Sequence, residues 1–325
     1  MPQTQVSTRH HYIPEFYLKR WCCSDGYLTQ FSKPFGDLVK PHRRFPSETG
    51  FVKKLYMLEG VPRDRSALLE ENFFKPIDDR AAVVLRKIES GQNSFDGEER
   101  VAWTQFIVSL LFRHPEGIAA VKSRLHDTLV ITSPSAEWRW HRQRKPEEPS
   151  TLRAAMRRDI ERDPAQVQRQ ALKIVADLAA SERIGSLIAK MWWGTFQLPL
   201  GAGIMFSSDR PVLKFGGLGD SGCHIFMPIG PRRVFWAANS RDMSNTIMIR
   251  SFARIVSLVN ESIVRRAVRY VYATTDTRLA YVQENMGAEP DPSPGELIGL
   301  LDRRGSLRRM RRAFNPPGWR IEHDR

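Results

Sequence analysis

The pattern of apolar residues changes at Phe196, and this change limits the folds open to the chain. Residues from about 65 to 195 are mainly typical of helices, because apolar side chains recur every three to four positions. From Phe196 onward the apolar runs are short and broken by Gly, Pro and Asn, as in FQLPLGAGIMF and CHIFMPIG, a pattern typical of antiparallel strands. The sequence therefore predicts an α+β fold that is predominantly helical, with a small antiparallel sheet in the C-terminal half.

Local signals mark where several helices begin. Asp96 is followed three residues later by Glu99, which predicts a capping box at the start of a helix with Trp103 and Phe106 on its buried side. Pro115 interrupts that pattern and predicts the first turn of another helix. Pro76 predicts a break between two helices in the segment before Asp96.

The chain is expected to fold as a single α+β domain over residues 1–290. This domain would hold a helix-rich part at 65–195 and a sheet with a late helix at 196–273. Residues 291–325 are expected to form a basic C-terminal helix and tail. The polar, proline-flanked segment at 133–150 is typical of a mobile insertion.

Composition excludes several classes of protein. Hydrophobic residues make up 41% of the chain, enough for a core, and no apolar run reaches the length of about 18 residues expected of a transmembrane helix. The three cysteines, Cys22, Cys23 and Cys223, lack the spacing of a disulfide framework or zinc site. A cytoplasmic protein with reduced thiols is expected, since no signal peptide is recognised.

The chain carries a net charge of +14, which favours polyanionic partners such as nucleic acid. Six arginines and no acidic residue occur at 303–314, and arginines alternate with tryptophans at 138–145. Such mixtures suit phosphate contact and base stacking. The alternative is a solvated helix face. The predicted phosphate-binding residues here are Arg139, Arg142, Arg308, Arg309, Arg311 and Arg312.

Five short segments follow one another in an order known from other proteins. They are HHYIPEFYLKRW, LLFRHP, MFSSDRPV, IFMPIGP and VNESIVRRAVRYVYA. With them the chain resembles the bacterial family that shares domain of unknown function 4238, from about residue 10 to residue 273. The resemblance implies a place among proteins of which some are anti-phage defence proteins, and hence a toxic or nucleic-acid-directed activity.

His10 and His11 precede a helix predicted to begin at Pro14. Histidine can act as acid, base or metal ligand near neutral pH. Neighbours on an extended segment point opposite ways, so one histidine would face a site and the other support it. Asp209, in the SSDRP turn, would orient a histidine or bind a metal, although aspartate also commonly closes turns. The alternative for the histidines is packing or capping.

Other polar residues interrupt apolar stripes. Arg113 lies beside its helix's apolar face and needs an anionic partner, either an internal carboxylate such as Glu71 or a substrate phosphate. Asn260 interrupts the late helix and is expected to bond the backbone of another segment, with Ser208 as further support. Glu71 is a candidate carboxylate ligand.

These residues lead to a hypothesis of a nucleic-acid-directed enzyme, such as a phosphodiesterase or nuclease. His10 or His11 would be general base or metal ligand, Asp209 and Glu71 would bind a divalent ion, and Arg113 would hold a phosphate. The rivals are a non-catalytic nucleic-acid-binding module and a phage-sensing interaction protein with a structural His/Asp cluster. Oligomeric state, metal identity and the choice between DNA and RNA stay open.

Overall fold

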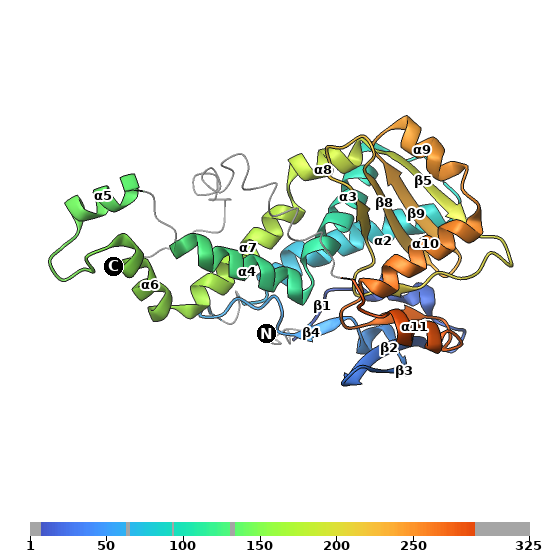
Figure 1. Cartoon of the computed structure of the whole chain (residues 1–325), viewed down its shortest axis with the longest axis horizontal. Coiled ribbons are helices and arrows are strands. Elements are labelled where there is room, and N and C mark those ends of the chain that lie inside the picture. The colour runs from blue at the N-terminus through green and yellow to red at the C-terminus, as the bar shows by residue number, and fades with distance from the viewer. Residues whose placement is uncertain (1–7, 63–65, 93, 131–133, 290–325) are drawn as a thin grey trace, which may run out of the picture. The chain divides into compact units, whose positions relative to one another are not determined.

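The computed structural model describes residues 8–62, 66–92, 94–130 and 134–289, which belong to one compact unit (Figure 1). The predicted C-terminal basic helix lies outside the described residues, as do Arg308, Arg309, Arg311 and Arg312. Mixed helices and antiparallel strands confirm the predicted α+β class.

The elements alternate along the chain in blocks. The α-helices are α1 Glu15–Leu18, α2 Lys75–Glu89, α3 Gly97–Phe112, α4 Pro115–Val130, α5 Pro134–Gln143, α6 Leu152–Arg162, α7 Pro164–Ala179, α8 Glu182–Ala189, α9 Arg241–Met248, α10 Phe252–Arg265 and α11 Leu279–Asn285. The short 3-10 and π-helices are η1 Lys19–Trp21, η2 Pro46–Glu48 and η3 Glu70–Phe74. The strands are β1 Arg9–His11, β2 Leu28–Phe35, β3 Leu38–Arg44, β4 Phe51–Lys53, β5 Trp192–Gln197, β6 Ser207–Ser208, β7 Leu213–Phe215, β8 His224–Gly230, β9 Arg233–Ala238 and β10 Val271–Ala273.

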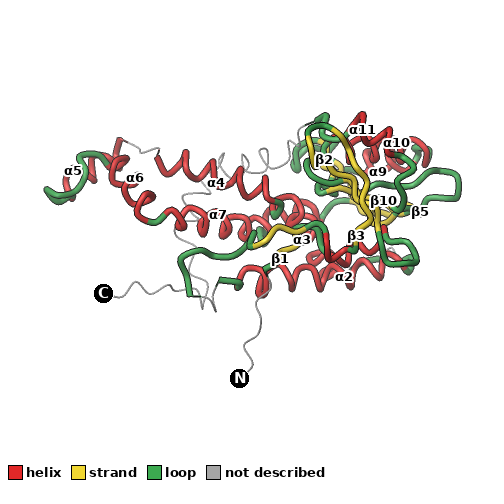
Figure 2. The backbone as a smooth tube through the Cα atoms, turned by 90° about the horizontal axis from the view of Figure 1, so that it is seen from below, coloured by secondary structure: helices red, strands yellow, loops and turns green. Residues whose placement is uncertain are grey.

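Helix α3 begins and packs as its sequence predicts. The Asp96 side chain accepts the backbone N–H of Glu99 at 2.8 Å, and the Glu99 carboxylate accepts the N–H of Asp96 at 3.1 Å. Trp103 and Phe106 are fully buried. Helix α3 contacts α2, α7 and α8, while α4 and α7 run side by side (Figure 2). Pro115 begins α4, as predicted.

One antiparallel sheet, in the order β5–β9–β8–β7, has helices on both faces. Adjacent residues of a strand point to opposite faces. Phe235 therefore meets Trp103 of α3, with ring centroids 5.7 Å apart, whereas Trp236 joins an apolar cluster that includes Ile255 and Val259 of α10. Figure 1 shows α10 beside β8 and β9.

Beside the sheet predicted for the C-terminal half, a second sheet joins strands from both halves of the chain. Its order is β3–β2–β10–β6, so N-terminal strands pair with the late strand β10. A third, two-stranded sheet pairs β1 with β4. Strand β3 is not predicted from the sequence because it contains Pro41, but β3 is an edge strand, where a proline need not donate a hydrogen bond.

Two predicted irregularities take another form. Residues 134–143 of the expected polar insertion form helix α5, none of whose residues is buried. At Pro76 the helix does not break: the π-helix η3 leads directly into α2, with Pro76 in the first turn. Proline lacks the backbone N–H that would bond here, and it stands where π-helical hydrogen bonding changes to α-helical.

The described residues contain no helix long and apolar enough to cross a membrane. All three cysteines are free, with Cys223 buried and Cys23 exposed.

Candidate functional site

His10 and His11 point to opposite sides of β1, as predicted for neighbours on a strand. His10 is completely buried, its ring stacks on Tyr56 with centroids 5.4 Å apart, and its Nδ1 accepts the backbone N–H of Tyr56 at 2.8 Å. His11 is half-buried, tilts against Phe51 and places Nε2 3.7 Å from a carboxylate oxygen of Glu15. The two histidines therefore have different partners.

Burial lowers the pKa of His11, and the charges of Arg113 and Arg9 lower it further, while the charge of Glu15 and a hydrogen bond to the backbone of Ser47 oppose these effects. The pKa falls because removing water destabilises the charged imidazolium. His11 is consequently neutral at pH 7.

Arg113 is completely buried at the end of α3 and joins three segments. Its Nε donates to the carbonyl of Tyr12 at 2.9 Å, and its Nη1 donates to Asp78 at 2.8 Å. The carbonyl of Arg113 accepts the hydroxyl of Tyr56 at 2.7 Å. A carboxylate partner was expected, but it is Asp78 and not Glu71.

Glu71 instead lies 3.5 Å from Lys75 on an exposed surface. The physical reason is the π-helix, whose wider turn rotates residues 70–74 relative to α2. The acidic residue of this turn that Arg113 influences is Glu70, which is not among the residues predicted from the sequence. Burial raises the pKa of Glu70 to about 7, although the charge of Arg113 opposes this shift.

Two buried polar atoms around Arg113 have no hydrogen-bond partner within the described part of the chain: Nη2 of Arg113 and Oε2 of Glu70. Burial also raises the pKa of Asp78 to about 6 against the opposing effect of Arg113. This cluster therefore combines a permanent positive charge with two carboxyl groups that burial makes easier to protonate.

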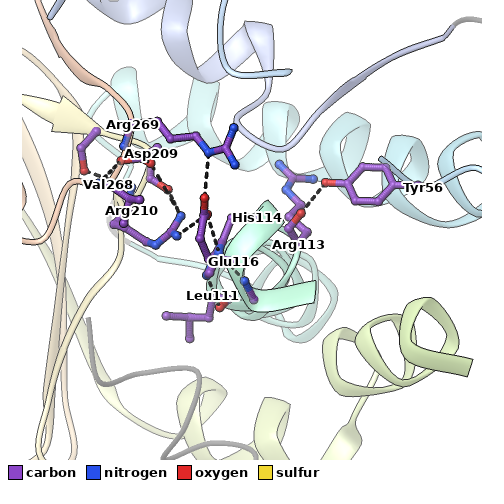
Figure 3. A network of polar contacts seen from close by, with 11 residues as sticks. Tyr56, Leu111, Arg113, His114, Glu116, Asp209, Arg210, Val268 and Arg269 are labelled. Carbon is purple, nitrogen blue, oxygen red and sulfur yellow. Dashed lines mark hydrogen bonds and ion pairs between the residues drawn. The ribbon is translucent and has the colours of Figure 1, made fainter. Parts of the chain in front are cut away.

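Asp209 fixes the connection between α10 and β10. It is fully buried, and its two carboxylate oxygens accept the backbone N–H groups of Val268 at 3.0 Å and Arg269 at 2.8 Å (Figure 3). Its own N–H donates to the carbonyl of Tyr270 at 3.0 Å. Burial raises the pKa of Asp209, and the two backbone hydrogen bonds oppose that shift.

Glu116, in the first turn of α4, holds two arginines from distant parts of the sequence. Its carboxylate accepts Nη2 of Arg210 at 2.6 Å and Nε of Arg269 at 2.7 Å (Figure 3). Burial alone would raise the pKa of Glu116, but the neighbouring side chains of His114, Arg210 and Arg269 hold it well below its usual range. The ionised form of Glu116 is therefore favoured at neutral pH.

His114 belongs to the same turn. Its Nδ1 accepts the N–H of Gly117 at 2.8 Å, and its Nε2 lies 3.1 Å from the carbonyl of Leu111 (Figure 3). These contacts fix a buried ring within the connection between α3 and α4.

The connection between α3 and α4 thus brings together the segments that carry the family resemblance. Arg113 contacts the opening segment through Tyr12, and Glu116 contacts the SSDRP turn through Arg210. A histidine was predicted to pair with Asp209. In the opening segment the charge of Asp209 instead acts on Tyr12, whose pKa is raised by burial first, then by Tyr272 and then by Asp209.

Ser208 and Asn260 hold the chain around this turn. The hydroxyl oxygen of Ser208 accepts the N–H of Arg210 at 3.0 Å. Asn260 accepts the N–H of Phe206 at 2.8 Å and donates to the carbonyl of Ile204 at 2.8 Å. The expected bond of Asn260 to another segment's backbone is therefore present, just before the serines.

The chemistry open to the network is limited by its contacts. Within residues 8–62, 66–92, 94–130 and 134–289, no group of three or more His, Cys, Asp and Glu side chains is placed to hold a metal ion. His10 and Asp209 are both sealed from solvent. The network reaches the surface at Glu116 and Arg269, whose side chains are 35% and 43% exposed.

The predicted phosphate-binding residues of the described chain lie elsewhere, on α5. Arg139 and Arg142 are exposed, and the guanidinium of Arg142 lies 4.8 Å from the ring centroid of Trp138. Trp140 turns inward and donates its Nε1–H to the carbonyl of Pro149 at 2.9 Å.

Comparison with known proteins identifies the family. A family model described as "Protein of unknown function (DUF4238)" matches residues 9–277. No curated protein and no solved structure matches the chain. Residues 9–277 include the opening segment, the Arg113–Glu116 connection and the SSDRP turn. The protein belongs to the DUF4238 family.

Proposed function

We propose that this protein binds nucleic acid without cleaving it, with α5 as one contact surface. The observation that carries the proposal is the pairing of Arg142 with the ring of Trp138, which is 59% exposed on a helix that buries none of its residues. An exposed indole beside a guanidinium offers a face on which a base can stack, next to a charge that can meet a phosphate.

The residues of α5 divide into two faces. Successive residues turn by 100° around a helix, so Trp138, Arg142 and Arg139 share one side. On the other side, Glu137 accepts the N–H of Leu152 at 2.8 Å. Within the described residues neither Arg139 nor Arg142 forms an ion pair with a carboxylate. The Trp138 face therefore offers positive charge beside an aromatic surface.

This combination suits single-stranded nucleic acid. An exposed indole stacks with a base of any sequence, and arginines neutralise the neighbouring phosphates. The contacts of the buried network support binding over the predicted hydrolysis, because His10 and Asp209 are sealed and already bonded. They support a structural role for these two residues.

The test is fluorescence anisotropy of labelled single-stranded DNA and RNA, titrated with the full chain over a salt series. We expect affinity to fall steeply with salt. The double variant Arg139→Ala/Arg142→Ala should weaken binding and reduce the slope of log Kd against log salt by about 1.4, or about 0.7 for each phosphate that the variant leaves without its arginine. Trp138→Ala should weaken binding about tenfold without changing the slope.

Matched controls separate this surface from net charge. Arg86→Ala/Lys122→Ala removes the same charge from exposed positions on α2 and α4, and Trp192→Ala removes another exposed tryptophan. Equal losses in the controls would disprove a specific role for α5. The fourfold Arg308, Arg309, Arg311 and Arg312→Ala variant tests the predicted C-terminal contribution.

Product analysis on the same substrates tests the predicted nuclease activity. Cleavage that is abolished by His10→Gln or Asp209→Asn in a folded protein would reverse the proposal. The defence role that the resemblance implies remains a prediction, tested by plaque counts with the Arg139→Ala/Arg142→Ala variant.

A further inference from the structure

A cavity of about 510 Å³ contains none of the residues of α5. It is bounded by the segment at 201–206, by α10 and by the start of α11. Cavities that bind small ligands commonly have volumes of about 300–1,000 Å³. The residues that matter for its chemistry are Phe206, Arg232, Ser257, Thr277, Arg278 and Tyr281.

Two aromatic residues, Phe206 and Tyr281, line the cavity. The rings of Phe206 and Tyr281 are nearly parallel, at an angle of 5° with centroids 6.2 Å apart. Phe206 is buried, and Asn260 bonds its backbone N–H and the carbonyl of Ile204. Tyr281 is half-buried and presents a flat surface that needs little rearrangement to stack with a planar ring.

The walls of the cavity carry positive charge. Arg232 donates from Nη1 to the carbonyl of Pro199 at 3.2 Å, and the guanidinium of Arg278 lies 5.3 Å from the Tyr281 ring centroid. In the described part of the chain, neither arginine forms an ion pair with a carboxylate. Arg278 is exposed and can turn from the ring toward an anion. Glu261 acts electrostatically on Tyr281 but does not line the cavity.

Hydroxyl groups complete the lining. Ser257 and Thr277 are both exposed at the cavity and can donate or accept hydrogen bonds. Two arginines favour a phosphate, the Tyr281 ring favours a planar partner, and the hydroxyls suit a sugar or base edge. We propose that this cavity binds a nucleotide unit, with the phosphate between Arg232 and Arg278 and the base against Tyr281.

The same chemistry can come from a free nucleotide or from one unit of a strand. The experiment is isothermal titration calorimetry of the full chain with the four ribonucleoside monophosphates, inorganic phosphate and a single-stranded pentanucleotide. We expect at least one nucleotide-containing ligand to bind about tenfold more tightly than inorganic phosphate, because the base adds stacking. Binding of mononucleotides identifies free nucleotides as ligands, whereas binding of the pentanucleotide alone identifies a strand.

Variants locate the binding. Arg278→Ala should weaken binding about tenfold or more, as expected when a charge-assisted hydrogen bond is removed. Tyr281→Leu should remove the preference over phosphate, while Tyr281→Phe should retain it. Ser257→Trp fills the cavity from an exposed helical position and should abolish binding with an unchanged melting temperature.

Arg241→Ala, at an exposed position on α9, is the charge-matched control and should bind as the wild type does. The proposal is overturned if no nucleotide-containing ligand binds, if phosphate binds equally well, or if Ser257→Trp binds normally. It does not depend on α5: Trp138→Ala should leave mononucleotide binding unchanged, so failure of the cavity and failure of the α5 surface are distinguishable.

Discussion

Replacing Asp209 by asparagine separates a structural role from a catalytic one. The carboxylate accepts two backbone N–H groups, from Val268 and Arg269, in a site with no solvent exposure. Asparagine has one acceptor oxygen, and its amide NH₂ would face the second N–H. The variant therefore leaves one buried backbone donor without an acceptor.

The expected magnitude follows from these two hydrogen bonds. A hydrogen bond to a charged group contributes about 1.5–3 kcal/mol, and an unsatisfied buried donor costs about 1–3 kcal/mol. Removing a buried carboxylate, whose pKa burial raises, offsets part of the loss. We expect Asp209→Asn to lower the free energy of unfolding by about 2–4 kcal/mol.

Urea unfolding followed by tryptophan fluorescence measures this loss as a lower midpoint with an unchanged m value. The matched control is Asp220→Asn, because Asp220 accepts the N–H of Gly217 at 2.8 Å in an exposed turn. That change should cost less than about 0.5 kcal/mol. Wild-type stability in Asp209→Asn would refute the structural role. A stable variant that loses nucleic-acid cleavage would support the catalytic role.

Four further substitutions test buried and half-buried parts of the fold. Phe106→Ala should cost about 3–5 kcal/mol because the ring is fully buried against Trp103, and an unchanged melting temperature would contradict that packing. The pKa of Glu70 is raised from 4.5 to about 7, which means that the folded state favours the protonated carboxyl. The free energy of unfolding should therefore fall by up to about 3 kcal/mol as pH rises from about 4.5 to 7. Glu70→Gln should remove that part of the pH dependence in urea titrations; an unaltered profile would show that Glu70 does not titrate in this range. His10→Gln should lower stability by about 1 kcal/mol because the stacking on Tyr56 is removed, and His11→Gln by less, since His11 is half-buried. Equal melting temperatures for both variants would contradict this order.

The features that the sequence predicts well depend on residues close together in the chain. The start of α3 follows from Asp96 and Glu99, which are only three residues apart and bond each other's backbone. The burial of Phe106 follows from helical periodicity, and the opposite orientations of His10 and His11 follow from strand geometry. In each case local covalent geometry determines the outcome.

Pairing between distant strands is not encoded in such a local signal. Strand β10 lies between β2 and β6, and this arrangement buries Val271 and Phe31 together. Strand β3 is recognised only once its position at the sheet edge is known, because Pro41 argues against an interior strand. The same limit applies to Glu71, since no periodicity rule anticipates the π-helix that places Glu70 nearer Arg113.

The candidate residues illustrate the same division. The sequence identified Arg113 and Asn260 as polar residues that need partners, because an unpaired polar group in a core is costly. It identified Asp209 as a residue that would bind a metal, orient a histidine or close a turn. Only the tertiary structure decided which partners they have: Asp78 for Arg113, two backbone N–H groups for Asp209, and the segment just before Ser207 for Asn260. The ion pairs of Glu116 with Arg210 and Arg269 form only when the chain brings together positions 94 and 153 residues apart. Composition and spacing determine that a buried charge must be compensated, whereas the packing of distant segments selects the group that compensates it.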